Sequence, residues 1–237
     1  MKLLIAIPCY GSMMSYHTTK GLLQLQTLGI DVDIQFLGNE SLVTRARNRL
    51  THRFLKSNAT HFMFIDSDIG FDAKDILELI KADKPIIGGA YPKKEINWHS
   101  IKEIIKKNPN VNDEELKLAA GKYAFTPMQN EFELNKPIEV TNIGAGFMMI
   151  QRNVFTKLKE AGLVTISYCP YEKSQILQYW TCGADDKGIE LSEDYYFSYQ
   201  CRKIGINTYL FPDIVLKHIG TYTFEGSIPW MLTQEQM

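Results

Sequence analysis

The sequence lacks the features that define several large classes of protein. Its 26 lysines and arginines nearly balance 27 aspartates and glutamates, so the formal net charge is −1 and there is no global positive field to hold a nucleic acid. No stretch approaches the roughly 18 consecutive apolar residues of a membrane span, and the apolar start of the chain is too short for a signal peptide. We therefore expect a cytoplasmic protein with no nucleic-acid partner and no transmembrane segment.

Cysteine and glycine motifs are also scarce. The four cysteines form no CxxC pair, which argues against a zinc ribbon or a redox motif. No GxGxxG motif follows an expected strand, which disfavours a dehydrogenase. The chain shows no repeat, low-complexity segment or linker, and its 237 residues are enough to bury a full core. These observations favour one globular domain.

Strand and helix patterns alternate through the first 90 residues. Apolar runs of strand length lie at residues 2–8, 32–37, 61–65 and 85–90, and helical patterns lie at 16–28, 41–56 and 72–82. The apolar runs do not alternate with polar residues, which indicates strands that are buried on both faces. This order predicts an α/β fold with a mostly parallel central sheet flanked by helices.

The second half of the chain is less regular. Residues 93–136 are polar with scattered apolar anchors, and we expect them to form a surface excursion or a mobile flap within the single domain. The pattern then predicts strands at 138–143 and 207–211, an apolar run at 147–150, helices at 152–161 and 192–204, and an aromatic loop at 168–183. Ser192 is expected to cap the helix that begins there.

The clearest candidate site follows the third expected strand, because an open parallel sheet binds ligands beyond the carboxyl ends of its strands. Asp66-Ser67-Asp68 directly follows the strand at 61–65. Two carboxylates at this place can point into one cleft and share a divalent cation; the alternative is that one of them only caps the next helix. A second D-x-D motif, Asp31–Asp33, precedes a strand and is expected in a surface turn.

This strand followed by Asp-Ser-Asp resembles the metal-dependent glycosyltransferases of the GT-A fold, whose D-x-D motif holds Mn²⁺ or Mg²⁺ on a nucleotide-sugar diphosphate. The resemblance covers about residues 1–92 and 138–221, and residues 93–136 match no family that we can name. More loosely, the compact chain is similar to small single-domain glycosyltransferases of bacteria and large DNA viruses. The resemblance implies transfer of a sugar from a nucleotide sugar, with UDP favoured, to a hydroxyl of a glycan or glycoconjugate.

The resemblance also implies a nucleotide-binding role for two segments. Pro8 and Tyr10 lie in the loop after the first strand, where such enzymes hold the base and the ribose. Tyr10 either stacks on the base or covers the edge of the sheet. Arg45 and Asn48 share a face of the helix at 41–56, which in this family faces the nucleotide; a solvated basic face is the alternative.

Further residues complete the expected donor site. Arg47 lies nearer the apolar side of the same helix, so it either snorkels or pairs with a buried acid, for which Asp66 is a candidate. Asp66 and Ser67 belong to the D-x-D segment, and Lys93 follows the fourth strand and adds positive charge. Gly146 lies in a turn that borders the donor sugar and the acceptor in this family; a plain tight turn is the alternative.

The segment at 191–197 resembles the acidic helix start that supplies the catalytic base in many inverting members. Asp194 is the expected base, and Glu193 is expected to orient the acceptor or the donor. Acids in a first helical turn are also common without a catalytic role, because the helix dipole favours them. Trp180, in an aromatic stretch, is a candidate platform for the acceptor, although packing is equally compatible with the sequence.

The last strand is followed by His218, which resembles the third metal ligand of several GT-A enzymes. It would join Asp66 and Asp68 around one cation, and an imidazole beside carboxylates favours Mn²⁺ over Mg²⁺. A structural role for a single histidine is the alternative. Two other functions stay open: a non-catalytic module that binds a sugar nucleotide or a glycan, and a sugar nucleotidyltransferase, for which residues 8–12 lack the glycine-rich loop.

Overall fold

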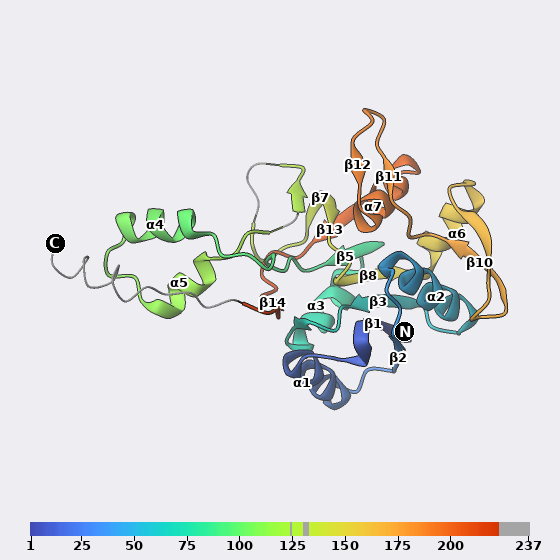
Figure 1. Cartoon of the computed structure of the whole chain (residues 1–237), viewed down its shortest axis with the longest axis horizontal. Coiled ribbons are helices and arrows are strands. Elements are labelled where there is room, and N and C mark those ends of the chain that lie inside the picture. Colours follow the sequence, from blue (N-terminus) through green and yellow to red (C-terminus); the bar gives the residue numbers. More distant parts are fainter. Residues whose placement is uncertain (124, 130–132, 223–237) are drawn as a thin grey trace.

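The centre of the structure, a computed structural model that describes residues 1–123, 125–129 and 133–222, is an eight-stranded sheet with the order β2-β1-β3-β8-β5-β13-β7-β6 (Figure 1). Its strands are β1 (Leu3–Cys9), β2 (Val32–Gly38), β3 (His61–Ile65), β5 (Ile86–Gly88), β6 (Phe125–Pro127), β7 (Ile138–Ile143), β8 (Phe147–Gln151) and β13 (Thr208–Leu210). Only β7 and β8 run against the other six strands of this sheet. The α/β class and the helix-flanked sheet with most strands in one direction are therefore confirmed, although the sheet is mixed because β7 and β8 are each antiparallel to both of their neighbours.

Helices cover both faces of this sheet. The helices are α1 (Tyr16–Leu25), α2 (Val43–Lys56), α3 (Ala73–Ala82), α4 (Trp98–Lys107), α5 (Asp113–Ala119), α6 (Arg152–Glu160) and α7 (Glu193–Lys203), with short 3₁₀ turns at Tyr10–Ser12 and Gln26–Leu28. Core side chains of α1 and α3 form one apolar cluster, and those of α2, α6 and α7 form the other. No helix within the described residues is both long enough and apolar enough to span a membrane.

Strand β1 is apolar throughout because it is covered by helices on both faces of the sheet. Leu3 and Ile5 belong to the cluster under α1 and α3, whereas Leu4 and Ala6 belong to the cluster under α2, α6 and α7. Successive side chains of a strand point to opposite faces, so a strand covered on both sides has no polar alternation. Within the sheet, β1 lies between β2 and β3.

Helix α3 begins with a capping box and offers a test of its electrostatics. Asp72 accepts from the backbone N–H groups of the first turn, and the Asp75 carboxylate accepts from the Asp72 N–H at 3.2 Å. Burial, together with the charges of Asp72 and Glu78, raises the pKa of Asp75 from 3.8 to about 6. The native protein therefore holds this proton more tightly than the unfolded chain, and ionisation of Asp75 destabilises the fold above about pH 6.

We expect Asp75→Asn to raise the free energy of unfolding at pH 7.5 by ~1–2 kcal/mol, because the amide keeps the acceptor oxygen and removes the buried charge. This gain should shrink as the pH falls through 6 toward 4, where the native wild-type carboxyl is already protonated. Urea unfolding at both pH values measures it, with Glu160→Gln at an exposed position of α6 as the control. A gain that stays constant across this range would contradict the raised pKa.

Two segments differ from the expectation. Part of the predicted aromatic loop is a hairpin of β9 (Thr165–Cys169) and β10 (Ser174–Gln178), followed by the short strands β11 (Gly183–Ala184) and β12 (Glu190–Leu191). The first four residues of β9 are exposed, so the hairpin carries no alternation of apolar and polar side chains. The excursion at 93–136 contains α4 and α5, neither of which buries a side chain, and they project away from the sheet in Figure 1.

Candidate functional site

The ends of β1 and β3 meet the loop after β2 at one edge of the sheet, as expected for this topology. A cavity of about 190 Å³ lies there, and we call it the first cavity. Its lining residues are Pro8, Tyr10, Glu40, Ser41, Val43, Ala46, Asp66, Ser67 and Asp68. Five of the residues that the sequence singled out therefore surround one space, although they come from two separate strand ends.

Arg47 is a buried arginine that binds Asp66 of the cavity lining. Its side chain, only 4% exposed, donates from Nη1 and Nη2 to the two carboxylate oxygens of Asp66, both at 3.1 Å. Its Nε also donates to Oε1 of Glu193 at 3.2 Å. Burial alone would lower the pKa of Arg47, but Asp66 and Glu193 outweigh it and raise this pKa, so the guanidinium stays charged. The expected pairing of Arg47 with Asp66 is confirmed, and the snorkelling alternative is excluded.

The start of α7 is thereby held against the end of β3. Next to Glu193, the Asp194 carboxylate accepts at Oδ1 from the Ser192 hydroxyl and from the Tyr195 N–H at 2.9 Å. Its Oδ2 lies 3.4 Å from the N–H of Ala145, in the turn between β7 and β8. Ser192 occupies the N-cap position, but its hydroxyl orients Asp194 and makes no capping bond to the backbone of the helix.

Gly146, in the same turn, is in contact with Asp66. The N–H of Asp66 donates to its carbonyl at 2.9 Å, and its own N–H donates to the hydroxyl of Tyr91 at 3.2 Å. A Cβ atom at position 146 would lie 2.9 Å from both the Asp66 carboxylate and the Tyr91 ring. Glycine is needed here because any side chain would push Asp66 away from Arg47. Burial raises the pKa of Tyr91, so its hydroxyl stays neutral.

His218 reaches the acidic pair through strand pairing. The short strand β14 (Lys217–His218) pairs with β4 (Ile69–Gly70), which directly follows Asp68. The His218 Nε2 lies 3.6 Å from Oδ2 of Asp68, and its Nδ1 lies 2.8 Å from the carbonyl oxygen of Pro92. A carbonyl only accepts, so Nδ1 carries a proton and Nε2 is directed toward the carboxylate. This contact between distant segments confirms that Asp68 and His218 converge.

Lys94 binds the same carboxylate, with its Nζ 2.5 Å from Oδ2 of Asp68. Burial would raise the pKa of Asp68, but the neighbouring side chains of His218 and Lys94 outweigh it and lower this pKa to about 2. Lys94 was not among the predicted residues. It follows β5 at the same sheet edge, but a lysine in a polar segment carries no spacing signal that separates it from Lys93.

The predicted trio of metal ligands is not assembled in this structure. Asp66 uses both oxygens for Arg47, and the described part of the chain contains no cluster of three or more His, Cys, Asp or Glu side chains suited to a metal. Asp68 and His218 remain as an oxygen and nitrogen donor pair, because Lys94 binds Oδ2 of Asp68 rather than Oδ1 and the Pro92 carbonyl holds the proton of His218 on Nδ1. Such a pair fits a cation that takes its other ligands from phosphate oxygens and water.

Arg45 is paired with Glu40, one of the residues that line the first cavity. Its Nη2 donates to Oε1 of Glu40 at 2.6 Å, and Arg49 lies 3.5 Å from the other oxygen of Glu40. The hydrogen bond from Arg45 outweighs burial and lowers the pKa of Glu40. Because its side chain remains 46% exposed, Arg45 is available to a ligand beside Glu40.

Asn48 and Trp180 are core residues, which corrects two expectations. Oδ1 of Asn48 accepts from the N–H groups of Tyr179 and Trp180, and its amide donates to the Trp180 carbonyl at 2.8 Å. Trp180 is 0% exposed, donates to the Thr51 hydroxyl at 2.9 Å and stacks on Phe197 with ring centroids 4.2 Å apart. No face of this indole reaches solvent, so Trp180 offers no surface to an acceptor, and the bonds of Asn48 hold it away from a nucleotide.

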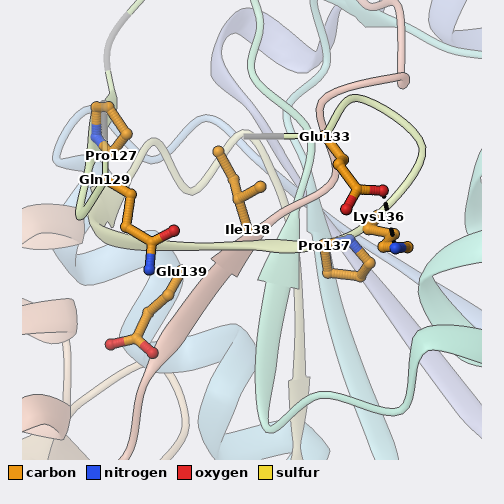
Figure 2. A pocket seen from close by; sticks show the side chains of 7 residues that line it. All are labelled: Pro127, Gln129, Glu133, Lys136, Pro137, Ile138 and Glu139. Carbon is orange, nitrogen blue, oxygen red and sulfur yellow. Dashed lines mark ion pairs between the residues drawn. The ribbon is translucent and has the colours of Figure 1, made fainter. Parts of the chain in front are cut away.

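Lys93 does not line the first cavity. It lines a second cavity of about 380 Å³, formed by Lys93, Lys94, Glu95, Ile96, Trp98, His218, Gly220, Thr221 and Tyr222. A larger hollow of about 560 Å³ lies at β6 and β7, where an ion pair of 2.8 Å joins Glu133 and Lys136 (Figure 2). Its described lining residues include none of those predicted for the site.

Comparison with known proteins supports the fold of this chain and no finer property. No family model and no curated protein matches this sequence. The chain is similar to A197 from STIV, with a TM-score of 0.51 and 18% identity over 93% of this chain and 87% of that chain. GalNAc-T7, solved with UDP, GalNAc and Mn²⁺, matches with a TM-score of 0.45 and 11% identity over 97% of this chain and 46% of its own. S. aureus TarS 1–349, in complex with UDP-GlcNAc, matches with a TM-score of 0.40 and 11% identity over 96% and 60%.

What the chain shares with A197 is the fold, along most of both chains. An identity of 18% does not carry an activity from one protein to another. The residues at the sheet edge therefore carry the information about function.

Proposed function

We propose that this protein is a metal-dependent glycosyltransferase that moves a sugar from a nucleoside-diphosphate sugar, with UDP as the expected nucleotide, to a hydroxyl of a glycan or glycoconjugate. The observation that carries the proposal is the convergence of Asp68 and His218 beside the first cavity. An oxygen and nitrogen donor pair next to a cavity at the carboxyl end of a sheet suits a cation shared with a diphosphate. Asp194 supplies a carboxylate beside the neighbouring turn.

The first cavity is the proposed place of the nucleoside. Tyr10 is 73% exposed at its rim, so its ring is free to stack on a base. Pro8 and Ser67 line the same cavity, and Arg45 adds a positive charge beside Glu40 of its lining. The diphosphate would then lie beside Asp68, because the carboxylate of Asp66 is already paired with Arg47.

Asp68 and His218 would hold the divalent cation, Mn²⁺ or Mg²⁺, and Asp66 would stay outside its ligands. A cation bound there supplies Lewis-acid chemistry by offsetting the negative charge of the leaving diphosphate. The protein's own contribution at this place is Lys94, whose hydrogen bond keeps the Asp68 carboxylate ionised. Arg47 holds Asp66 and Glu193 in one network, which fixes the distance between the ends of β3 and α7.

Asp194 is the proposed catalytic base. Its Oδ1 is held by Ser192 and Tyr195, whereas among the described residues Oδ2 has only the long contact with the Ala145 N–H. Oδ2 takes the proton of the acceptor hydroxyl as that oxygen forms a bond to the anomeric carbon. The bond between the anomeric carbon and the diphosphate oxygen breaks, and the nucleoside diphosphate leaves with the electron pair. Attack opposite the leaving group inverts the anomeric centre.

A thermal-shift screen of nucleoside diphosphates with Mn²⁺ or with EDTA tests this function, because a ligand of the native state raises its melting temperature. We expect the largest increase with UDP and Mn²⁺ together. Incubation with UDP-sugars should then release UDP. Binding of UDP and Mn²⁺ without turnover of any donor would instead support the non-catalytic binding module.

The donor pair gives a more specific prediction. Asp68→Asn and His218→Gln should each weaken Mn²⁺-dependent binding of UDP by at least ~10-fold, measured by isothermal titration calorimetry. Asp31→Asn, in the second D-x-D motif, is the matched control because Asp31 is exposed and far from the sheet edge that carries the site. Equal losses for Asp31→Asn and Asp68→Asn would show that the location of the motif is irrelevant.

A further inference from the structure

The two cavities share a wall. Asp68 lines the first cavity and Lys94 lines the second, and the carboxylate and ammonium groups are 2.5 Å apart. His218, which faces Asp68, also lines the second cavity. A ligand in the second cavity therefore lies directly across this ion pair from a ligand in the first.

The second cavity has an apolar wall that includes an exposed aromatic residue. Trp98, at the start of α4, is 59% exposed, and Ile96 and Tyr222 beside it are 36% and 51% exposed. Trp98 is the first residue of α4, and Asn97 caps this helix by accepting from the Ser100 N–H at 3.1 Å. An exposed indole in a concave surface is a feature of ligand sites, because an aromatic face covers apolar C–H groups while the cavity edge remains wet.

The base of the excursion holds this wall in place. The Lys93 N–H donates to the Lys122 carbonyl at 2.8 Å, and Pro92 forms a bridge with Tyr123. The segment that leads into α4 and the segment that follows α5 are thus joined at the sheet edge. The cavity does not depend on α4 alone.

The charges of the second cavity favour an anion. Glu95 is paired with Lys122 at 3.5 Å, and Lys94 is paired with Asp68. Lys93 has no acidic partner among residues 1–123, 125–129 and 133–222, which leaves one uncompensated ammonium group beside the apolar wall. An anionic group placed at Lys93 gains attraction that no protein carboxylate within this described region already satisfies.

We propose that the second cavity binds a saccharide that carries an anionic group, a carboxylate or a phosphate, and that this saccharide is the acceptor. Trp98 covers the apolar face of a sugar ring, and Lys93 binds the anionic group. The role of acceptor rests on the proposed glycosyltransferase function, whereas the binding site itself does not. Trp98, rather than the buried Trp180, is then the aromatic platform for the acceptor, and residues 93–136 contribute to acceptor binding.

Nuclear magnetic resonance of the full chain labelled with ¹⁵N-tryptophan tests this site. The probes are a hyaluronan tetrasaccharide for the carboxylate, glucose 6-phosphate for the phosphate and maltotetraose as the neutral saccharide. The indole signal absent in Trp98→Phe identifies Trp98. We expect at least one anionic probe to shift the Trp98 signal, to leave the buried Trp180 signal unchanged, and to bind more tightly than maltotetraose.

Variants separate the two contacts. Trp98→Ala should weaken binding of the anionic probe by roughly tenfold, as measured from the resonances of the probe itself. Lys93→Ala should weaken binding of the anionic probe but not of maltotetraose. Tyr168→Ala on β9 and Lys107→Ala at the end of α4, both exposed, are the matched controls and should bind as wild type. No Trp98 shift with either anionic probe, or equal affinity for maltotetraose, would overturn the proposal.

Titration of UDP with Mn²⁺ into the same samples distinguishes this inference from the proposed function. Loss of saccharide binding in Trp98→Ala with UDP binding unchanged supports a separate acceptor site. Loss of UDP binding in Trp98→Ala would instead make the second cavity part of the donor site and contradict the inference. Absence of UDP binding in wild type, with the saccharide still bound at Trp98, would remove the transferase and leave the saccharide site.

Discussion

Replacement of Asp194 by asparagine is expected to reduce sugar transfer by roughly 100- to 10,000-fold, the usual contribution of a general base. Asparagine has the same shape, and its oxygen can still accept from the hydroxyl of Ser192 and the N–H of Tyr195. It cannot take a proton from the acceptor hydroxyl. The variant should therefore fold, bind UDP with Mn²⁺ as wild type does, and fail in the chemical step. Single-turnover kinetics with a UDP-sugar donor measures this loss separately from binding.

The matched control for this experiment is Asp185→Asn. Asp185 lies in the turn between β11 and β12, where its carboxylate accepts from the local N–H groups of Lys187 and Ile189. Transfer should be unchanged in this variant. Full transfer by Asp194→Asn would remove Asp194 as the base and would also remove the argument for inversion.

Replacement of Arg47 by methionine is expected to lower the free energy of unfolding by ~3–5 kcal/mol, because it leaves Asp66 and Glu193 without their shared cation. The Arg47 side chain is 4% exposed and that of Glu193 is 13% exposed, so water cannot fully replace the guanidinium. Asp66, at 27% exposed, is partly solvated, which places the expected loss toward the lower end of this range. Urea unfolding at pH 7 measures the change.

Two further variants make this prediction specific. Adding Asp66→Asn to Arg47→Met should recover part of the loss, because it removes one of the unpaired charges. Arg53→Met should cost less than ~1 kcal/mol, because Arg53 is 33% exposed and its partner Glu172 keeps Arg49 at 3.1 Å. If Arg47→Met and Arg53→Met cost the same, the network through Arg47 does not hold the two element ends together.

The first half of the fold could be predicted because strands that are buried on both faces appear in the sequence as continuous apolar runs. Strands such as β1 and β3 are apolar at nearly every position, and α2 and α3 are separated from them by turns. Where side chains are exposed, such runs disappear. Helices α4 and α5 bury no side chain, and four of the five residues of β9 are exposed, so neither pattern separates these elements from polar loops.

The site was predictable where chain topology decided its geometry. Residues after β1 and β3 had to meet because parallel neighbouring strands end at the same edge, and a buried arginine beside Asp66 needed an acid. Contacts set by packing between distant elements were not predictable. The burial of Trp180 depends on Asn48 and Thr51 of α2, and the ion pair of Lys94 with Asp68 depends on the path of the chain after β5.

The central claim is that Asp68 and His218 hold a divalent cation for a nucleoside diphosphate in the first cavity. Anomalous diffraction at the manganese edge, from crystals grown with UDP and Mn²⁺, tests it directly. We predict a manganese peak within ~2.5 Å of both the Asp68 carboxylate and Nε2 of His218, with UDP in contact with the same ion. UDP bound in the first cavity without a manganese peak between these two side chains, or a peak at another place, would contradict the claim.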